Sequence, residues 1–462
     1  MMTLKELFRT KSIQDMEEPP SGKSLRRCLH AFDLVLLGIG AIIGAGVFVL
    51  TGVVAATKAG PAVVISYLLA GFASALAALA YAELAANIGG CGSAYTYAYV
   101  GFGELIAWII GWDLLLEYGM SVSTVAIGWS GYVINGLQAV GLGLPNAIAH
   151  NPFAGGIINL PAVLIILILT ALLSIGVKQS ARFNSIIVLV KLAVICLFVV
   201  VAAFYVQVKN WQPFAPFGWD GIVRGAALVF FAYIGFDAVS TTAEEAVKPA
   251  RDLPIGILFS VVICGFVYLI VAGLVTGIVP YTELNVASPI AHALLVIGHN
   301  VAAGFIALGA IAGLTSVMLV MYYGLTRVFL AMSRDHLLPP VFSRIHPTTL
   351  TPVTVIIYSG IVMAIIAGLT PINEAVELVN IGTLLAFILV CAGVIVLRWK
   401  RPELTTKFRL PFYPILPLLG IIFCLYLMFH LPLVTWGRFA IWLLIGIAIY
   451  FFYSRNRSLL QR

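Results

Sequence analysis

Charge is what this sequence has least of. Asp, Glu, Lys and Arg make up 10% of its 462 residues, whereas 61% are hydrophobic and the mean hydropathy is +1.07. Soluble globular domains carry about 25% charged residues. So little charge cannot cover a surface that faces water. This excludes a soluble fold and indicates that most of the chain faces lipid or other helices.

Motifs that would bring other chemistry are missing as well. No G-x-x-x-x-G-K-[ST] loop for nucleotide phosphates occurs, and no gap between the apolar stretches could hold a nucleotide-binding domain. The seven histidines lack the spacing of metal ligands or of an acid–base pair, and the six cysteines include no C-x-x-C pair. We therefore expect no cofactor, no metal site and no enzyme activity, and we expect the cysteines to be buried hydrophobes.

Long apolar stretches recur along the whole chain. A transmembrane helix needs about 20 mostly apolar residues. We count twelve such stretches, at roughly 32–56, 62–86, 103–135, 158–176, 184–207, 222–246, 255–279, 300–331, 352–369, 376–397, 412–430 and 435–453. The sequence therefore predicts an all-α polytopic membrane protein with twelve transmembrane helices in the lipid bilayer.

The basic residues are unevenly divided between alternate loops. Of the 26 Lys and Arg residues, 20 fall in the N-terminal segment, in every second loop or in the C-terminal tail. This bias follows the positive-inside rule of membrane proteins. It accounts for the net charge of +7 without a nucleic-acid partner. It predicts a multi-pass protein of the cell membrane with both termini in the cytoplasm.

Two spans contain glycines that an ordinary lipid-facing helix does not need. The first holds Gly38, Gly40, Gly44 and Gly46, and the sixth holds Gly235. Each glycine weakens a helix by about 1 kcal/mol relative to alanine. A single G-x-x-x-G motif is also typical of close helix packing, which is the alternative interpretation. The occurrence of glycines in both spans favours a break in both helices.

The two glycine sites lie at similar depth in the membrane. Gly44 follows Asp33 by 11 residues, about 16 Å along a helix and close to the bilayer midplane. Interrupted helices at corresponding places in two halves are typical of inverted-repeat transporters. We predict a cytoplasmic segment 1–30, a first repeat 31–207, a second repeat 222–397, peripheral helices 412–453 and a cytoplasmic tail 454–462.

Short motifs along the chain resemble the amino acid–polyamine–organocation superfamily. They are Gly44-Ala45-Gly46-Val47-Phe48, Tyr81-Ala82-Glu83-Leu84 and Gly92-Ser93-Ala94-Tyr95-Thr96-Tyr97. The cationic amino acid transporter family is the nearer match, through segments 111–118, 236–249 and 327–339. The resemblance implies amino acid transport by a five-plus-five inverted-repeat fold with discontinuous first and sixth helices. Twelve spans, where mammalian members usually have fourteen, indicate a bacterial relative.

An amino acid that enters the membrane must replace the hydration of both its charged ends. Free backbone N–H groups at a helix break can hold its carboxylate, and free carbonyls can hold its ammonium. Carried onto this chain, the superfamily's pattern assigns the carboxylate to Gly44, Ala45 and Gly46. It assigns the ammonium to carbonyls around Ile43, Phe231, Ala232 and Ile234, beside the second break at Gly235. Phe231 is expected either to close over the substrate or to be a packed aromatic.

The side-chain preference depends on residues near these breaks. Ser316 and Met321 are expected near mid-membrane, where methionine makes an adaptable apolar wall. Such a pocket favours neutral L-amino acids such as alanine. An arginine-selective site needs a carboxylate, and Asp237, Asp113 and Glu117 are the candidates, although buried acids also brace helix contacts. We expect broad import that leans to neutral amino acids, with cationic amino acid transport as the alternative.

Lys191 is the only lysine deep inside a predicted span. An intramembrane cation is costly and is therefore a functional candidate, and related proton-coupled members carry a lysine in the fifth span. We predict that Lys191 couples transport to a proton gradient; a lysine bound permanently to backbone carbonyls is the alternative. An amino acid exchanger and a polyamine permease stay open, and no accessory membrane subunit can be read from the sequence. A channel is disfavoured because rings of charged residues are missing.

Overall fold

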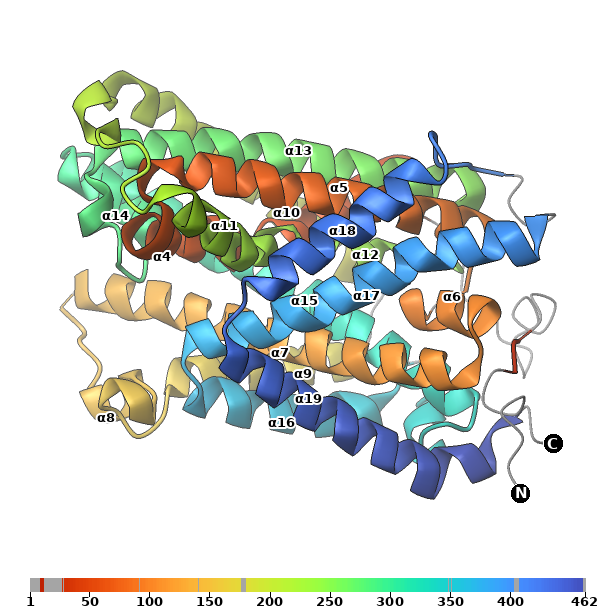
Figure 1. Cartoon of the computed structure of the whole chain (residues 1–462). Helices are drawn as coiled ribbons and strands as arrows, with labels where there is room; N and C mark the ends of the chain where they lie inside the picture. The colour runs from red at the N-terminus through yellow and green to blue at the C-terminus, as the bar shows by residue number, and fades with distance from the viewer. Residues whose placement is uncertain are drawn as a thin grey trace.

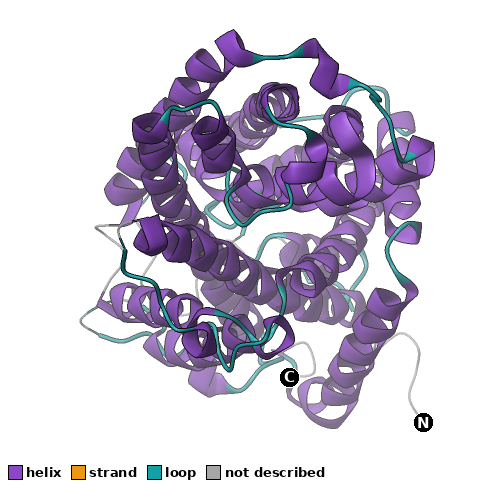
Figure 2. Ribbon diagram, turned by 90° about the vertical axis from the view of Figure 1, so that its left-hand side faces the viewer, coloured by secondary structure: helices purple, strands orange, loops and turns teal. Residues whose placement is uncertain are grey.

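The computed structural model describes residues 9–11, 27, 29–90, 92–139, 141–175, 180–347, 349, 351–402 and 407–459. These ranges are mostly helical and contain no β-strand (Figure 2). Most of the predicted cytoplasmic segment 1–30 lies outside the described residues. So do Lys5, Lys23, Arg26 and Lys178 among the basic residues counted above, and Cys28 and Cys91 among the six cysteines.

Each predicted span corresponds to a helical segment in the described part of the chain. The segments are α3 (Ala31–Ile42) continued by η1 (Gly46–Leu50), α4 (Thr51–Val54) and η2 (Ala55–Ala59); α5 (Val63–Asn87); α7 (Glu104–Ala139); α9 (Leu160–Ile175); α10 (Ser180–Ala202); α11 (Gly218–Val229) continued by η7 (Phe230–Tyr233) and α12 (Phe236–Ser240); α13 (Pro249–Ile278); α15 (Asn300–Arg334); α16 (Val353–Leu369); α17 (Ile372–Lys400); α18 (Ile415–Phe429); and α19 (Leu433–Ile449).

Short helices occupy the connections. They are η3 (Gly60–Ala62), α6 (Ala94–Gly101), α8 (Asn146–Ala149), η4 (Pro152–Ala154), η5 (Ala203–Tyr205), η6 (Val208–Trp211), η8 (Tyr281–Glu283), α14 (Pro289–Val296), η9 (Pro340–Ser343), η11 (Tyr450–Ser454) and η12 (Arg455–Arg457).

Length and composition support a membrane-spanning bundle. Among the described residues, eight helical segments are long and apolar enough to cross a bilayer, and the first of them, Ala31–Asn87, contains two of the predicted spans. The helices Leu160–Ile175, Val353–Leu369 and Ile415–Phe429 are shorter but apolar. The prediction of an all-helical polytopic membrane protein is therefore confirmed.

The long helices run side by side along one axis of the molecule (Figure 1). At the centre, α13 packs against α3 and α5, and α15 packs against α7 and α10. Helix α17 contacts α7, α5 and both last helices, α18 and α19. The first and sixth predicted spans are interrupted, which confirms the two predicted discontinuous helices. The grouping of the helices into two inverted repeats stays a prediction.

The beginning and the end of the described chain meet at one end of the bundle. The backbone N–H of Lys11 donates to the Tyr99 carbonyl in α6, and its ammonium lies 2.7 Å from the Asp335 carboxylate at the end of α15. The Leu459 N–H donates to the Asp335 carbonyl at 3.3 Å. Helix α8 lies at the opposite end (Figure 1).

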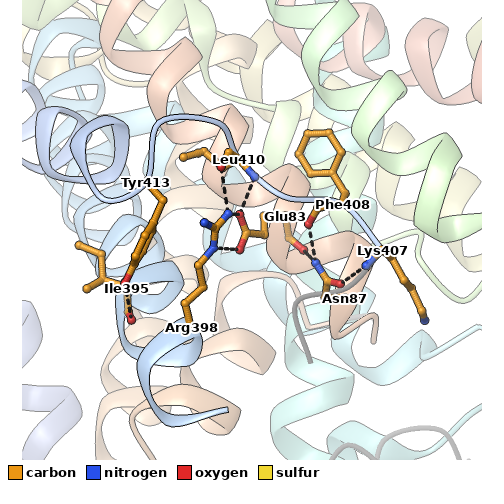
Figure 3. Close-up of polar contacts among 8 residues, drawn as sticks. All are labelled: Glu83, Asn87, Ile395, Arg398, Lys407, Phe408, Leu410 and Tyr413. Atoms are coloured by element: carbon orange, nitrogen blue, oxygen red, sulfur yellow. Dashed lines mark hydrogen bonds and ion pairs between the residues drawn. The ribbon is translucent and has the colours of Figure 1, made fainter. Parts of the chain in front are cut away.

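A buried ion pair joins helices far apart in the sequence at the end that holds Lys11. Glu83, in α5, is fully buried and receives two bonds from the Arg398 guanidinium in α17, at 2.7 and 2.5 Å (Figure 3). The Leu410 N–H also donates to Glu83, at 2.7 Å. The Arg398 guanidinium lies 4.5 Å from the centre of the Tyr413 ring. Segment 407–413 is thereby held against the ends of both helices.

Candidate functional site

The first break follows directly from the glycine-rich sequence of the first span. Helix α3 ends at Ile42, and Ile43 is extended, with φ −73° and ψ 99°. A Cβ on Gly44 would lie 2.8 Å from Val317 Cγ2, and a Cβ on Gly46 would lie 2.2 Å from Ala232 Cβ. Both distances are far below the ~3.5–4.0 Å contact of carbon atoms. Glycine is therefore required for close approach to α15 and η7.

The second break depends on a single glycine. The Gly235 φ is +119°, a region in which residues with a Cβ are strained, and Ile234 before it is extended, with ψ 142°. The Cβ missing from Gly235 would lie 2.9 Å from the Ala41 carbonyl. The two breaks therefore touch each other, and glycine allows the contact on both sides.

A small cavity, called here the central cavity, lies where the two breaks meet. It is lined by Ala41, Ile42, Gly44, Ala45, Gly46, Ser121, Val125, Phe231, Ile234, Val317 and Met321. Its volume is about 10 Å³, close to what one water molecule needs. An amino acid is larger, so the wall must open to admit one, and the side chains of Phe231 and Met321 are the most adaptable parts of it.

The structure brings most of the predicted substrate residues to this cavity. Six of them line it: Gly44, Ala45, Gly46, Phe231, Ile234 and Met321. Ile43, Ala232 and Gly235 belong to the same two breaks but contribute no lining. Ser316 lies elsewhere, because its hydroxyl donates to the Asn184 side-chain oxygen in α10 at 2.6 Å. The assignment of each residue to the substrate stays a prediction.

Lys191 binds the end of α3 at the first break. It is fully buried in α10, and its ammonium donates to the carbonyls of Gly40 and Ile43, both at 2.9 Å. In an uninterrupted helix these carbonyls would accept from the N–H groups four residues further along. The ammonium takes the place of those N–H groups, so its charge state and the geometry of the break are physically linked.

Two tyrosines donate to further carbonyls of the breaks. The Tyr268 hydroxyl, in α13, lies 2.8 Å from the Ile42 carbonyl oxygen and 2.7 Å from the Ala232 carbonyl oxygen, so one proton is shared between the two breaks. The Tyr67 hydroxyl, in α5, donates to the Gly46 carbonyl at 2.9 Å. A carbonyl has a second lone pair, so these bonds leave room for an ammonium at Ile43 and Ala232.

Backbone donors stay free on the other side of the first break. Hydrogen bonding along this segment resumes with the Phe48 N–H, which donates to the Gly44 carbonyl at 3.2 Å. Within the described ranges no protein acceptor is found for the N–H groups of Gly44 and Ala45. Both residues line the central cavity. Free N–H groups at the start of a helical segment favour an anion.

The three acidic candidates do not line the central cavity. Asp237 accepts from the Tyr118 hydroxyl and, at 3.1 Å, from the Gly235 N–H, so it braces the second break. Asp113 and Glu117 are buried in α7 and have no hydrogen-bond partner among the described residues. The lining of the central cavity is therefore uncharged.

Sequence reasoning missed four residues that come from other helices. Ser121, Val125 and Val317 line the cavity, and Tyr268 joins the two breaks. None of the four lies in a glycine-rich segment or shows an unusual charge. A tyrosine at mid-depth of α13 was the one available signal, because a buried hydroxyl needs a partner.

Comparisons with known proteins agree over nearly the whole chain. The family model described as "Amino acid permease" matches residues 29–454. The "Branched-chain amino acid permease BcaP" of Bacillus subtilis (strain 168) is 50% identical, over 99% of both chains. The "Methylthioribose transporter" of the same organism is 48% identical, over 99% of this chain and 100% of the relative.

A more distant relative agrees with the family resemblance seen in the sequence. "Cationic amino acid transporter 4, vacuolar" of Arabidopsis thaliana is 39% identical, over 82% of this chain and 64% of its own length. The motifs named above therefore identified the correct superfamily.

Proposed function

The chain belongs to the amino acid permease family, and from this premise we propose that it imports amino acids with uncharged side chains by proton-coupled alternating access. Membership makes it a membrane-embedded transporter rather than an enzyme. The cell membrane is the proposed location, with both termini in the cytoplasm as the distribution of basic residues indicates.

The central cavity is the observation that carries this proposal. Free N–H groups at Gly44 and Ala45, which line the cavity, are suited to a carboxylate. The carbonyls of Ile43 and Ala232 belong to the same breaks but not to the lining, and they are suited to an ammonium once the cavity opens. Backbone groups would thus recognise the part that all amino acids share. Because both breaks contribute, the separation of the two interrupted helices would control access to the bound substrate.

The lining of the cavity supports an apolar or small substrate side chain. Val125, Val317 and Met321 bring only apolar surface, and Ser121 brings one hydroxyl. An arginine or lysine side chain would lose its hydration here without a carboxylate in return. The relative BcaP, named as a branched-chain amino acid permease, fits this preference.

Lys191 is the proposed proton carrier. As an ammonium it donates to two carbonyls at the end of α3, those of Gly40 and Ile43. Loss of the proton would weaken both bonds, since hydrogen bonds of charged groups are roughly twice as strong as neutral ones. Proton binding would therefore stabilise the break in the form that the substrate needs.

Uptake by proteoliposomes tests the proposal. Purified protein is reconstituted and offered radiolabelled L-alanine, L-leucine or L-arginine under an imposed proton gradient, sodium gradient or no gradient. We expect accumulation of alanine or leucine driven by the inward proton gradient alone. Dominant arginine uptake would contradict the side-chain preference, and a sodium requirement would contradict proton coupling.

Methylthioribose is the second candidate substrate and belongs in the same assay. The 48% identical relative is named as its transporter, and an uncharged cavity does not oppose a neutral sugar. It has no carboxylate for the N–H groups of Gly44 and Ala45. We therefore expect excess unlabelled alanine or leucine, but not methylthioribose, to inhibit uptake.

A further inference from the structure

A second, larger cavity lies beyond the central one, at the end of the bundle that holds α8. Its volume is about 320 Å³, within the range of about 300–1,000 Å³ typical of ligand sites. Its walls come from α7, α4, the connection between α7 and α9, segment 285–287 and the start of α17. By the distribution of basic residues these loops are predicted to lie outside the cell, so we call it the outer cavity.

The outer cavity is lined by neutral hydrogen-bonding groups. Five asparagines, one serine and one histidine take part, and the lining contains no charged residue. Asn159 is 6% exposed; its side-chain oxygen accepts from Ser130 and from the Ala162 N–H, which leaves its NH2 group for the cavity. The buried Nδ1 of His150 has no hydrogen-bond partner within the described residues. These groups point to a polar ligand without net charge.

A helix N-terminus opens on the same cavity. Helix α17 begins at Ile372, which lines the cavity together with Asn373, and no side chain caps its free N–H groups. The N-terminus of a 29-residue helix favours a carboxylate, and the acidic Glu374 in its first turn is not part of the cavity lining. The oxygens of Asn285 and Asn135 and the carbonyls of the loop can face an ammonium. Suitable groups are therefore present for both ends of a zwitterion, while the lining holds no carboxylate to balance a cationic side chain.

One layer of side chains separates the two cavities. Val125 lines the central cavity, and Gly128 lines the outer one. Likewise, Gly46 lines the central cavity, and Val49 lines the outer one. Each pair is three residues apart, about 4.5 Å along a helix. A Cβ on Gly128 would lie 3.2 Å from Val49 and 3.6 Å from Ala45. A displacement of less than one helical turn would connect the cavities.

We propose that the outer cavity is a reception subsite, which binds an amino acid with an uncharged side chain before it enters the central cavity. The subsite rests on the proposed function, because its ligand is the transported substrate. Its neutral lining would already reject cationic amino acids, so selection would occur in two steps.

Two kinds of variant remove the subsite without touching the central cavity. The first is the double variant Asn285→Leu/Asn373→Leu, which removes two amides. Both residues are exposed, and neither side chain makes a hydrogen bond within the described residues. Ala287→Phe fills the cavity with a ring. The matched control is Ala147→Phe, on an exposed residue of α8 at the same end of the bundle but outside the lining.

Binding stoichiometry and uptake kinetics are measured on full-length protein in nanodiscs and proteoliposomes, with labelled L-alanine and L-leucine. We expect two molecules bound per wild-type protein and one in either outer-cavity variant. The KM should rise about tenfold while Vmax stays within twofold, and Ala147→Phe should match wild type. If Ala287→Phe does not fold, the double asparagine variant gives the same readout.

The results separate the two ideas. One bound molecule in a wild type that transports normally, or two in every variant with unchanged KM, would overturn the subsite and leave the transporter intact. A wild type that neither binds nor accumulates either amino acid would overturn the proposed function and the subsite with it.

Discussion

Replacing Gly46 by alanine tests the contact between the two interrupted helices. The added Cβ would lie 2.2 Å from Ala232 Cβ and 2.4 Å from Ala232 Cα. One of these atoms belongs to the backbone, so a rotation of a side chain cannot relieve the overlap. The two breaks must separate by roughly 1–2 Å to restore the ~3.5–4.0 Å contact of carbon atoms.

The cost follows from the geometry. Overpacking a well-packed interior costs about 1–3 kcal/mol. If this strain acts on the form of the site that binds substrate, each 1.4 kcal/mol lowers affinity about tenfold. We therefore expect the KM for L-leucine uptake by Gly46→Ala to rise by roughly 5- to 150-fold.

Uptake by proteoliposomes and thermal unfolding of the detergent-purified protein give the measurement. Gly119→Ala is the matched control, because this glycine of α7 has no atom closer than 4.0 Å to the added Cβ. It should keep the KM of the wild type. A Gly46→Ala variant with KM and Vmax within twofold of wild type would refute the role of this contact, as would an equal loss in Gly119→Ala.

Three further variants, one of them with a matched control, test separate parts of the molecule. Lys191→Met removes both bonds to the carbonyls at the end of α3, so proton-driven accumulation should be lost while counterflow persists; full accumulation would exclude coupling through this residue. Tyr268→Phe leaves two buried carbonyls without a donor. The free energy of unfolding should fall by about 1–3 kcal/mol, which is measured as a lower Tm; an unchanged Tm would contradict the shared bond. Glu83→Gln breaks a buried ion pair and should cost roughly 3–5 kcal/mol, whereas Asp220→Asn, which breaks an exposed pair with Arg224, should cost less than about 1 kcal/mol. Equal Tm values for these last two variants would contradict the importance of burial.

The sequence determined the fold class and predicted the place of the candidate site. Low charge and twelve apolar stretches require membrane helices, because lipid offers no partners for free backbone groups. Gly44, Gly46 and Gly235 marked both breaks, because a missing side chain is visible in the sequence itself. Lys191 was equally visible, since a cation within an apolar stretch is rare.

Only the tertiary structure decided what surrounds the breaks. Tyr268, Ser121 and Val317 come from helices whose sequences show nothing unusual, and their roles depend on which face each helix turns inward. The same packing turned Ser316 towards α10 and kept Asp237 out of the cavity. Periodicity predicts that a helix exists, but its rotation and neighbours follow from contacts between distant segments, which no local pattern records.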